Sequence, residues 1–508
     1  MTLARALSLS LAAAAGAATV FGFAPFGLSA LPLATLTVLL WQWHDAASPR
    51  EAAGTGFAFG LGLFGAGASW LYIAIQAFGG MPAPLAALAI AFLVAYLALW
   101  PAAAGWLAAR STRRRSFARL LVAAGAFTLA EWLRGFVFTG FPWLSVGYAQ
   151  VPEGLLRGYA PIGGVFMVSL SMSLCAALLV HVAGALARGA RGEAALAACG
   201  TAALVATGTL LAQVEWTRTA GAPVAVSLVQ GNIVQEEKFD PDFRNATYDR
   251  YLRLVDSSRG RLIVLPESAF PVFSDQVPDD VLLALIRTAM ARDGDVLLGL
   301  FTELPPPPGS TMPRYFNTVV ALGAGDPQFY RKHHLVPFGE TIPLEPLFGW
   351  IIRSALSIPL ADQARGPAYQ PPLAVAGQKV AVDICYEDAF GGELIPAARG
   401  AGMLVNVTND AWYGHSIAAW QHDQIAAMRA LEFGRPMLRA TNTGITSAIG
   451  PDGRTLGALP WFTTGVLEVN VAAREGETPY LRVGDALVLA ASIALIAAPI
   501  VVVRLGRR

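Results

Sequence analysis

Long apolar runs dominate the first 213 residues of the chain and return after residue 483. A helix that crosses a bilayer needs about 20 predominantly apolar residues, and eight runs approach that length. The predicted spans are residues 6–23, 28–43, 55–76, 85–108, 118–138, 162–187, 195–213 and 484–503. Several are rich in Gly and Ala, which let membrane helices approach closely. The pattern predicts a polytopic α-helical membrane domain of about eight transmembrane helices.

A different pattern occupies the segment between these runs. Short apolar runs bounded by turn residues, typical of buried strands, lie at 223–230, 261–265, 296–300 and 402–407. Two further segments have the apolar spacing of amphipathic helices, at 246–258 and 279–293. Alternating strands and helices over this length predict an α/β domain with its own core.

Three regions follow from these two patterns. They are a transmembrane domain (1–213), an external α/β domain (214–483), and a last transmembrane helix with a short tail (484–508).

The composition is typical of a membrane protein and differs from that of ordinary soluble proteins. The 508 residues are 55% hydrophobic and only 14% charged, whereas soluble domains average roughly 25% charged residues. The formal net charge is +1. Nucleic-acid binding usually needs a basic face or stripe, so we expect no nucleic-acid partner.

Arginines beside the spans predict the orientation, because cytoplasmic loops carry an excess of Lys and Arg. With the amino terminus inside, the cytoplasmic arginines are Arg5, Arg50, Arg110, Arg113, Arg114, Arg115, Arg119, Arg188, Arg191, Arg504, Arg507 and Arg508. Both termini are then cytoplasmic, and residues 214–483 lie outside. The first span could instead be a cleaved secretory signal, which would leave the rest of the topology unchanged.

A carboxylate, an ammonium and a thiol each follow a predicted strand in the α/β domain. Glu267, Lys332 and Cys385 would suffice for acyl transfer, with the carboxylate as general base, the thiolate as nucleophile and the cation lowering the thiol pKa and stabilising the oxyanion. The alternatives are a surface ion pair for Glu267 and Lys332, and a small buried packing residue for Cys385.

The sequence around these residues resembles the nitrilase, or carbon–nitrogen hydrolase, superfamily. With the flanking membrane helices, it is similar to the apolipoprotein N-acyltransferases within that superfamily. The matching blocks are residues 23–26, 141–148, 229–232, 265–268, 330–340, 384–387, 406–414, 421–422, 429–436 and 439–444. The resemblance therefore covers nearly the whole chain.

The resemblance implies a nitrilase-like α-β-β-α sandwich with a Glu267, Lys332 and Cys385 triad, and no cofactor. Cys385 would attack an acyl ester of a membrane phospholipid, typically phosphatidylethanolamine, leaving a thioester on the enzyme. The amino group of the S-diacylglyceryl cysteine of an apolipoprotein would then take the acyl chain as an amide. The resemblance also implies a bacterial inner membrane, with the catalytic domain facing the periplasm.

Five further residues lie in or beside the matching blocks. Glu340 and Glu387 would position Lys332 or the substrate amine, or form structural ion pairs. Tyr386 would shape the acyl pocket or simply pack, and Asn409 would support the site. Phe239 stands where the family commonly has a tryptophan, so it keeps an apolar ring and lacks the indole N–H donor.

An apolar segment, 346–360, lies between Glu340 and Cys385 and is too short to span a bilayer. We expect a lid or interfacial arm that contacts lipid, although a buried helix would also explain the pattern. The candidate lipid contacts are Phe348, Trp350, Ile351, Ile352 and Leu356.

Other chemistries find less support in the sequence. The histidines lack the spacing of a zinc site, so we expect no metal, and His422 is expected to be a hydrogen-bonded structural residue. A membrane-tethered amidase would use the same triad with water as acceptor. A transporter is a second alternative, but its spans would be expected to hold more ionisable residues than Glu131 and Arg134.

Overall fold

The computed structural model describes residues 3–306, 314–341 and 363–505, with the side chains of 502–505 left out. The chain divides into two compact units, which are treated separately below. The first comprises Met1–Tyr72, Pro82–Glu215 and Arg482–Arg508, and the second comprises Ile73–Met81 and Trp216–Leu481.

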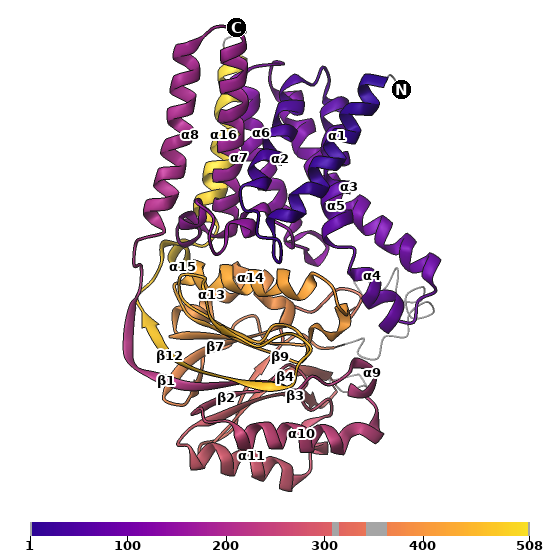
Figure 1. Cartoon of the computed structure of the whole chain (residues 1–508), viewed down its shortest axis with the longest axis vertical. Coiled ribbons are helices and arrows are strands. Elements are labelled where there is room, and N and C mark those ends of the chain that lie inside the picture. The colour runs from indigo at the N-terminus through magenta and orange to yellow at the C-terminus, as the bar shows by residue number, and fades with distance from the viewer. Residues whose placement is uncertain (1–2, 307–313, 342–362, 506–508) are drawn as a thin grey trace. The chain divides into compact units, whose positions relative to one another are not determined.

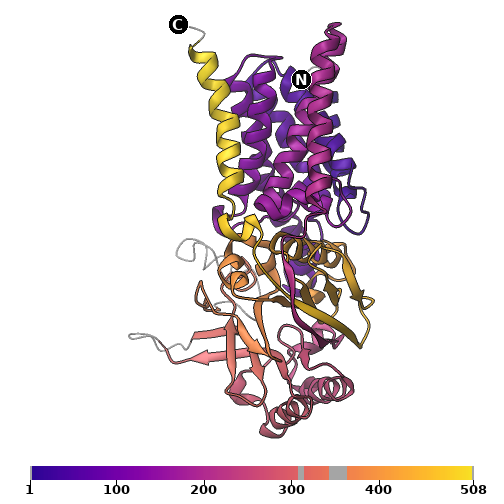
Figure 2. The same cartoon turned by 90° about the vertical axis from the view of Figure 1, so that its left-hand side faces the viewer.

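The first unit is a helical bundle (Figures 1 and 2). A helix lies at each of the predicted apolar runs. These helices are α1 (Leu3–Thr19), α2 (Leu31–Asp45), α3 (Pro49–Gly67), α5 (Ala83–Ser111), α6 (Phe117–Arg134), α7 (Ala160–Ala187), α8 (Arg191–Leu211) and α16 (Ala486–Leu505). Small residues allow close packing, because a Cβ on Gly62 of α3 would lie 2.0 Å from the carbonyl oxygen of Ala13 in α1.

The predicted count of eight spans is not confirmed. Among the described residues, four helices are long and apolar enough to cross a bilayer: Leu3–Gly22, Ala83–Ser111, Arg157–Ala187 and Arg191–Leu211. A fifth span results if Pro49–Gly67 and Leu71–Phe78, bent by 62°, count as one.

Each remaining helix has a physical reason for failing this test. Helix α2 has only 15 residues, which is short for the hydrocarbon core. Helix α6 carries Arg119, Glu131 and Arg134 within its 18 residues. The described apolar stretch of the last helix is Ala486–Val501.

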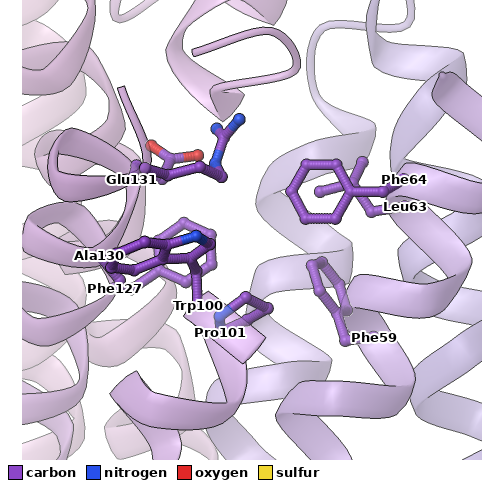
Figure 3. A pocket seen from close by; sticks show the side chains of 9 residues that line it. Phe59, Leu63, Phe64, Trp100, Pro101, Phe127, Ala130 and Glu131 are labelled. Carbon is purple, nitrogen blue, oxygen red and sulfur yellow. The ribbon is translucent and has the colours of Figure 1, made fainter. Parts of the chain in front are cut away.

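Glu131 and Arg134 of α6 anchor a loop of the bundle. Glu131 accepts a hydrogen bond from the Val146 amide at 2.9 Å, and Arg134 donates to the Trp143 carbonyl at 2.7 Å and to Ser145 Oγ at 3.1 Å. Figure 3 shows the cavity of about 10 Å³ beside them. Its lining consists of Phe59, Leu63, Phe64, Trp100, Pro101, Phe127, Ala130, Glu131 and Arg134. The hydrogen bonds of Glu131 and Arg134 hold this loop against α6.

The second unit contains two six-stranded sheets. The first has the order β12-β1-β2-β3-β4-β5, and the second has the order β11-β10-β9-β8-β7-β6. The strands are β1 (Arg218–Gln230), β2 (Leu262–Val264), β3 (Asp295–Leu304), β4 (Arg314–Leu322), β5 (Gln328–Arg331), β6 (Leu373–Val375), β7 (Gln378–Ile384), β8 (Met403–Thr408), β9 (Met437–Thr441), β10 (Ser447–Ile449), β11 (Thr455–Ala458) and β12 (Gly465–Glu475). The four predicted strands are confirmed as β1, β2, β3 and β8.

Helices cover the outer faces of both sheets, so this unit is an α-β-β-α sandwich (Figure 1). Helices α10 (Arg244–Ser257) and α11 (Asp279–Ala291) lie on the first sheet, and both were predicted. Helices α13 (Gly391–Arg399) and α14 (Ala418–Phe433) lie on the second. Apolar side chains such as Leu285 and Leu298 are fully buried between the layers, where each stabilises the fold by about 1.5–3 kcal/mol.

Strand direction places several chain turns at one edge of the sandwich. Strands β7, β8 and β9 are parallel neighbours, and β2 runs parallel to both β1 and β3. The residues that follow β2, β5, β7 and β8 converge, as their mutual contacts below show. These residues form the candidate active site.

Candidate active site

Glu267 lies in the turn after β2, and both of its carboxylate oxygens accept hydrogen bonds. Oε1 accepts a hydrogen bond from Asn317 Nδ2 at 2.7 Å, and Oε2 accepts one from the main-chain amide of Asn409 at 2.9 Å. The neighbouring strand approaches this turn closely at Gly299, where a Cβ would lie 2.3 Å from the Pro266 carbonyl oxygen. The carboxylate therefore has a fixed orientation.

Lys332 directly follows β5 and lies between two carboxylates. Its Nζ is 3.4 Å from Glu267 Oε1 and 2.8 Å from Glu340 Oε1, and the side chain is 1% exposed. Burial by itself lowers the pKa of Lys332, but the Glu340 and Glu267 carboxylates raise it overall. Lys332 is therefore a permanent cation.

Cys385 directly follows β7 and opens a short 3-10 helix, η8 (Cys385–Ala389). It is buried, and the charges of Glu267 and Lys332 both act on its thiol. Burial and Glu267 raise the pKa of the Cys385 thiol well above its usual value, while Lys332 opposes the shift. Lys332 acts in the expected direction but is outweighed, so the thiol is held in its protonated form.

Glu340 holds both Lys332 and the loop that follows it. One carboxylate oxygen contacts Lys332 Nζ, and the other accepts from the Val336 amide at 2.8 Å. Glu340 therefore links Lys332 to the main chain of the loop at Val336.

Glu387 faces main-chain amides and a phenol. Its carboxylate accepts from the amides of His333, His334 and Ile384 at 2.7, 2.9 and 2.7 Å, and from the Tyr330 hydroxyl at 2.9 Å. Burial raises the pKa of Glu387, while these amides oppose the rise. Glu387 thus joins the segment after β5 to the turn after β7.

Asn409 belongs to a network of amides beside Glu267. Its side chain donates to Gln235 Oε1 at 2.8 Å and accepts from Asn442 Nδ2 at 3.0 Å. Because the Asn409 amide also binds Glu267, this network supports the carboxylate.

Two aromatic candidates lie in ring clusters. Tyr386 packs edge-on against Phe390, with ring centroids 5.0 Å apart. Phe239 is half-buried, with its ring centroid 6.5 Å from that of Trp412, which also contacts Phe78 at 5.8 Å. The five candidate lid residues, Phe348, Trp350, Ile351, Ile352 and Leu356, lie outside the described residues.

Sequence reasoning overlooked Lys238 and Asn317. Lys238 Nζ donates to the Glu267 main-chain carbonyl at 3.0 Å. Burial lowers the pKa of Lys238 to about 8, although Glu267 and Cys385 act to raise it. For Asn317 the available signal was a polar residue near the start of the apolar run of β4. No local pattern marks Lys238, because it ends the polar helix α9 (Gln235–Lys238).

The described residues include no group of three or more His, Cys, Asp or Glu side chains that could hold a metal ion. What the site does bring together is a fixed carboxylate, a permanent cation and a protonated thiol. This arrangement can perform base-assisted thiol addition to a carbonyl, with the cation facing the oxyanion.

Two family models match the chain, and together they cover most of it. The Apolipoprotein N-acyltransferase N-terminal domain matches residues 15–178, and Carbon-nitrogen hydrolase matches residues 201–480.

Similar proteins extend this agreement over nearly the full length. An apolipoprotein N-acyltransferase from Nitrosomonas europaea is 48% identical, covering 94% of this chain and 94% of its own. Another from Chromobacterium violaceum is 43% identical, covering 95% of this chain and 91% of its own. A carbon-nitrogen hydrolase structure from Helicobacter pylori aligns with 51% of this chain and 91% of its own, at 14% identity and a TM-score of 0.33, which is too distant to add to the argument.

Proposed function

Because the chain belongs to the apolipoprotein N-acyltransferase family, and so is an N-acyltransferase of lipoproteins, we propose that it carries the acyl chain as a thioester on Cys385. The observation that supports this proposal is the placement of Lys332. Its ammonium lies 3.4 Å from Glu267 Oε1, and the charges of both residues act on the Cys385 thiol.

In the first half-reaction, Glu267 takes the thiol proton as the sulfur attacks the ester carbonyl of a phospholipid. Lys332 faces the oxyanion of the tetrahedral intermediate. When the C–O bond breaks, Glu267 returns the proton to the leaving alkoxide. The products are a lysophospholipid and the Cys385 thioester.

In the second half-reaction, the neutral amine of the lipoprotein attacks the thioester carbonyl. Glu267 accepts a proton from the attacking nitrogen, the C–S bond breaks, and the proton passes to the departing thiolate. Lys332 again faces the oxyanion. The products are an amide-linked acyl chain and the free Cys385 thiol.

The chain acts on phospholipid and lipoprotein substrates, and we propose their finer identity. The donor is phosphatidylethanolamine, and the acceptor is the α-amino group of an N-terminal S-diacylglyceryl cysteine. Phe239, beside Trp412, contacts lipid. Glu340 positions Lys332, and Asn409 positions Glu267.

The chain is a membrane protein with several apolar helices long enough to cross a bilayer, and its relatives are bacterial. We place it in the inner membrane with both termini cytoplasmic. Residues 1–213 form the transmembrane domain, 214–483 the periplasmic catalytic domain and 484–508 the last helix and tail. The arginine distribution supports this orientation.

One experiment separates transfer from hydrolysis by a membrane-tethered amidase. Purified full-length protein receives phosphatidylethanolamine and a diacylated lipopeptide with a free amino terminus. The proposal predicts that amide-linked lipopeptide accumulates, and that an acetylated lipopeptide stays unchanged. Free fatty acid as the main product in both samples would favour the hydrolase.

A further inference from the structure

The main chain of Cys385 has an unusual conformation, and two buried side chains contact its carbonyl oxygen. Its φ is +56°, in the left-handed region, which costs about 1–3 kcal/mol for a non-glycine residue and persists only where the surrounding structure holds it. Its carbonyl oxygen accepts from Asn406 Nδ2 at 3.1 Å and lies 3.2 Å from His422 Nε2. Both side chains are buried.

Both ring nitrogens of His422 face acceptors. Nδ1 lies 2.8 Å from Asp410 Oδ1, and Nε2 lies 3.1 Å from Asp388 Oδ1 as well as near the Cys385 carbonyl. Ionised carboxylates and carbonyls only accept, and a neutral imidazole has a single N–H. The geometry therefore requires hydrogen on both nitrogens, which makes His422 an imidazolium.

Arg439 closes this arrangement into a ring of four charges. It contacts the second oxygen of Asp388 at 3.2 Å and that of Asp410 at 3.1 Å. All four side chains are at most 1% exposed. The two carboxylates and two cations of this charge ring balance one another. A neutral His422 would leave one of the ring's buried negative charges uncompensated.

The ring members come from four elements. Asp388 lies in η8, Asp410 in η9 (Asp410–Tyr413), His422 in α14 and Arg439 in β9. Asn406 of β8 joins them, because it accepts from Arg439 at 2.8 Å and donates to the Cys385 carbonyl. A change at His422 can therefore reach the nucleophile directly.

We propose that His422 is a positioning residue, protonated at neutral pH, which holds the Cys385 carbonyl and shields the thiol from the negative charge of Asp388 and Asp410. The inference rests on the proposed role of Cys385 as nucleophile. It extends the expectation of a structural histidine by assigning a charge state and an electrostatic effect on the thiol.

The surrounding charges agree with this assignment. Burial and Arg439 lower the pKa of His422, but Asp388 and Asp410 raise it to about 9 overall. Asp423, on the same helix, is also near. Charged and titratable groups that interact with the thiol include Glu267, Lys332, Asp410, Lys238, Arg439 and Tyr413.

The test is the pH dependence of Cys385 alkylation by iodoacetamide in full-length protein, followed on the peptide that contains Cys385. Alkylation needs neither lipid substrate, so its outcome is independent of whether a thioester forms. In His422→Gln the two carboxylates lose one compensating charge. We expect the thiol to give up its proton less readily, so that at a fixed pH below about 9, where His422 is charged in the wild type, alkylation is about tenfold slower for each unit by which the thiol pKa rises.

A second variant of the same ring should act in the opposite direction. Asp410→Asn removes a negative charge that raises the thiol pKa, so its alkylation profile should move to lower pH. A purely structural role predicts no such opposition, because both variants would loosen the same packing. Since Asp410→Asn is read independently, it still tests the proposal if His422→Gln does not fold.

Glu432→Gln is the matched control. It breaks the 2.9 Å ion pair with Arg429, also fully buried on α14, and should lower the melting temperature while leaving the Cys385 profile in place. The proposal is overturned if either ring variant follows the wild-type profile, if both shift in the same direction, or if the control shifts as far as they do.

Discussion

The ammonium of Lys332 lies 2.8 Å from the carboxylate of Glu340, nearer than its 3.4 Å distance from Glu267. Glu340 also accepts from the Val336 amide, so its own position is fixed. This pairing helps to keep Lys332 charged, and in the proposed mechanism it leaves Glu267 as the group that exchanges protons with the thiol.

Glu340→Gln should slow both half-reactions. The amide keeps the shape of the side chain but removes one of the two charges that hold Lys332. We expect a loss of about tenfold to a hundredfold in the rate of acyl-enzyme formation, which corresponds to about 1.4–2.7 kcal/mol. Glu393→Gln is the control, because Glu393 is exposed and pairs with His334. Equal rates in Glu340→Gln and wild type would remove Glu340 from the mechanism.

Glu267→Gln should bind phospholipid but acylate slowly. Its Oε1 can still accept a hydrogen bond, whereas the neutral amide cannot take the thiol proton. A general base contributes roughly 10²–10⁴-fold, and we expect a loss in that range in single-turnover acylation followed by mass spectrometry. Lipid binding is measured separately by co-purification. Unimpaired acylation would exclude Glu267 as the base.

Lys238 should make stability depend on alkaline pH. Its pKa is lowered to about 8 by burial from an ordinary value of 10.5. Between these values the unfolded chain binds a proton that the folded chain does not, so folding stability rises with pH. Relative to Lys238→Met, the wild-type melting temperature should increase from pH 8 to pH 10. A constant difference across this range would show that Lys238 stays charged when folded.

The sandwich could be predicted because its strands and helices carry strong local patterns. Val296 to Leu300 is a short apolar run, and it forms the centre of β3 (Asp295–Leu304). The triad candidates could be found because Glu267, Lys332 and Cys385 each follow a strand. The distances between these three side chains could not be predicted, because they depend on how the two sheets pack against each other.

The charge ring and the number of membrane spans could not be predicted from local sequence patterns. Asp388, Asp410, His422 and Arg439 belong to four elements, and no spacing along the chain shows that they meet. In the bundle, hydropathy alone treated α6 as an ordinary span. The contacts of Glu131 and Arg134 with the loop at 141–146 explain why charged residues occur in that helix.

The central claim is that Cys385 carries the acyl chain. Purified full-length protein is incubated with phosphatidylethanolamine and no acceptor, and the mass of the peptide that contains Cys385 is measured by mass spectrometry. We predict a gain of one acyl chain that hydroxylamine removes, no gain in Cys385→Ala, and an unchanged gain in Cys199→Ala, which removes an exposed free cysteine. Absence of this mass shift from active enzyme, or full activity in Cys385→Ala, would contradict the account.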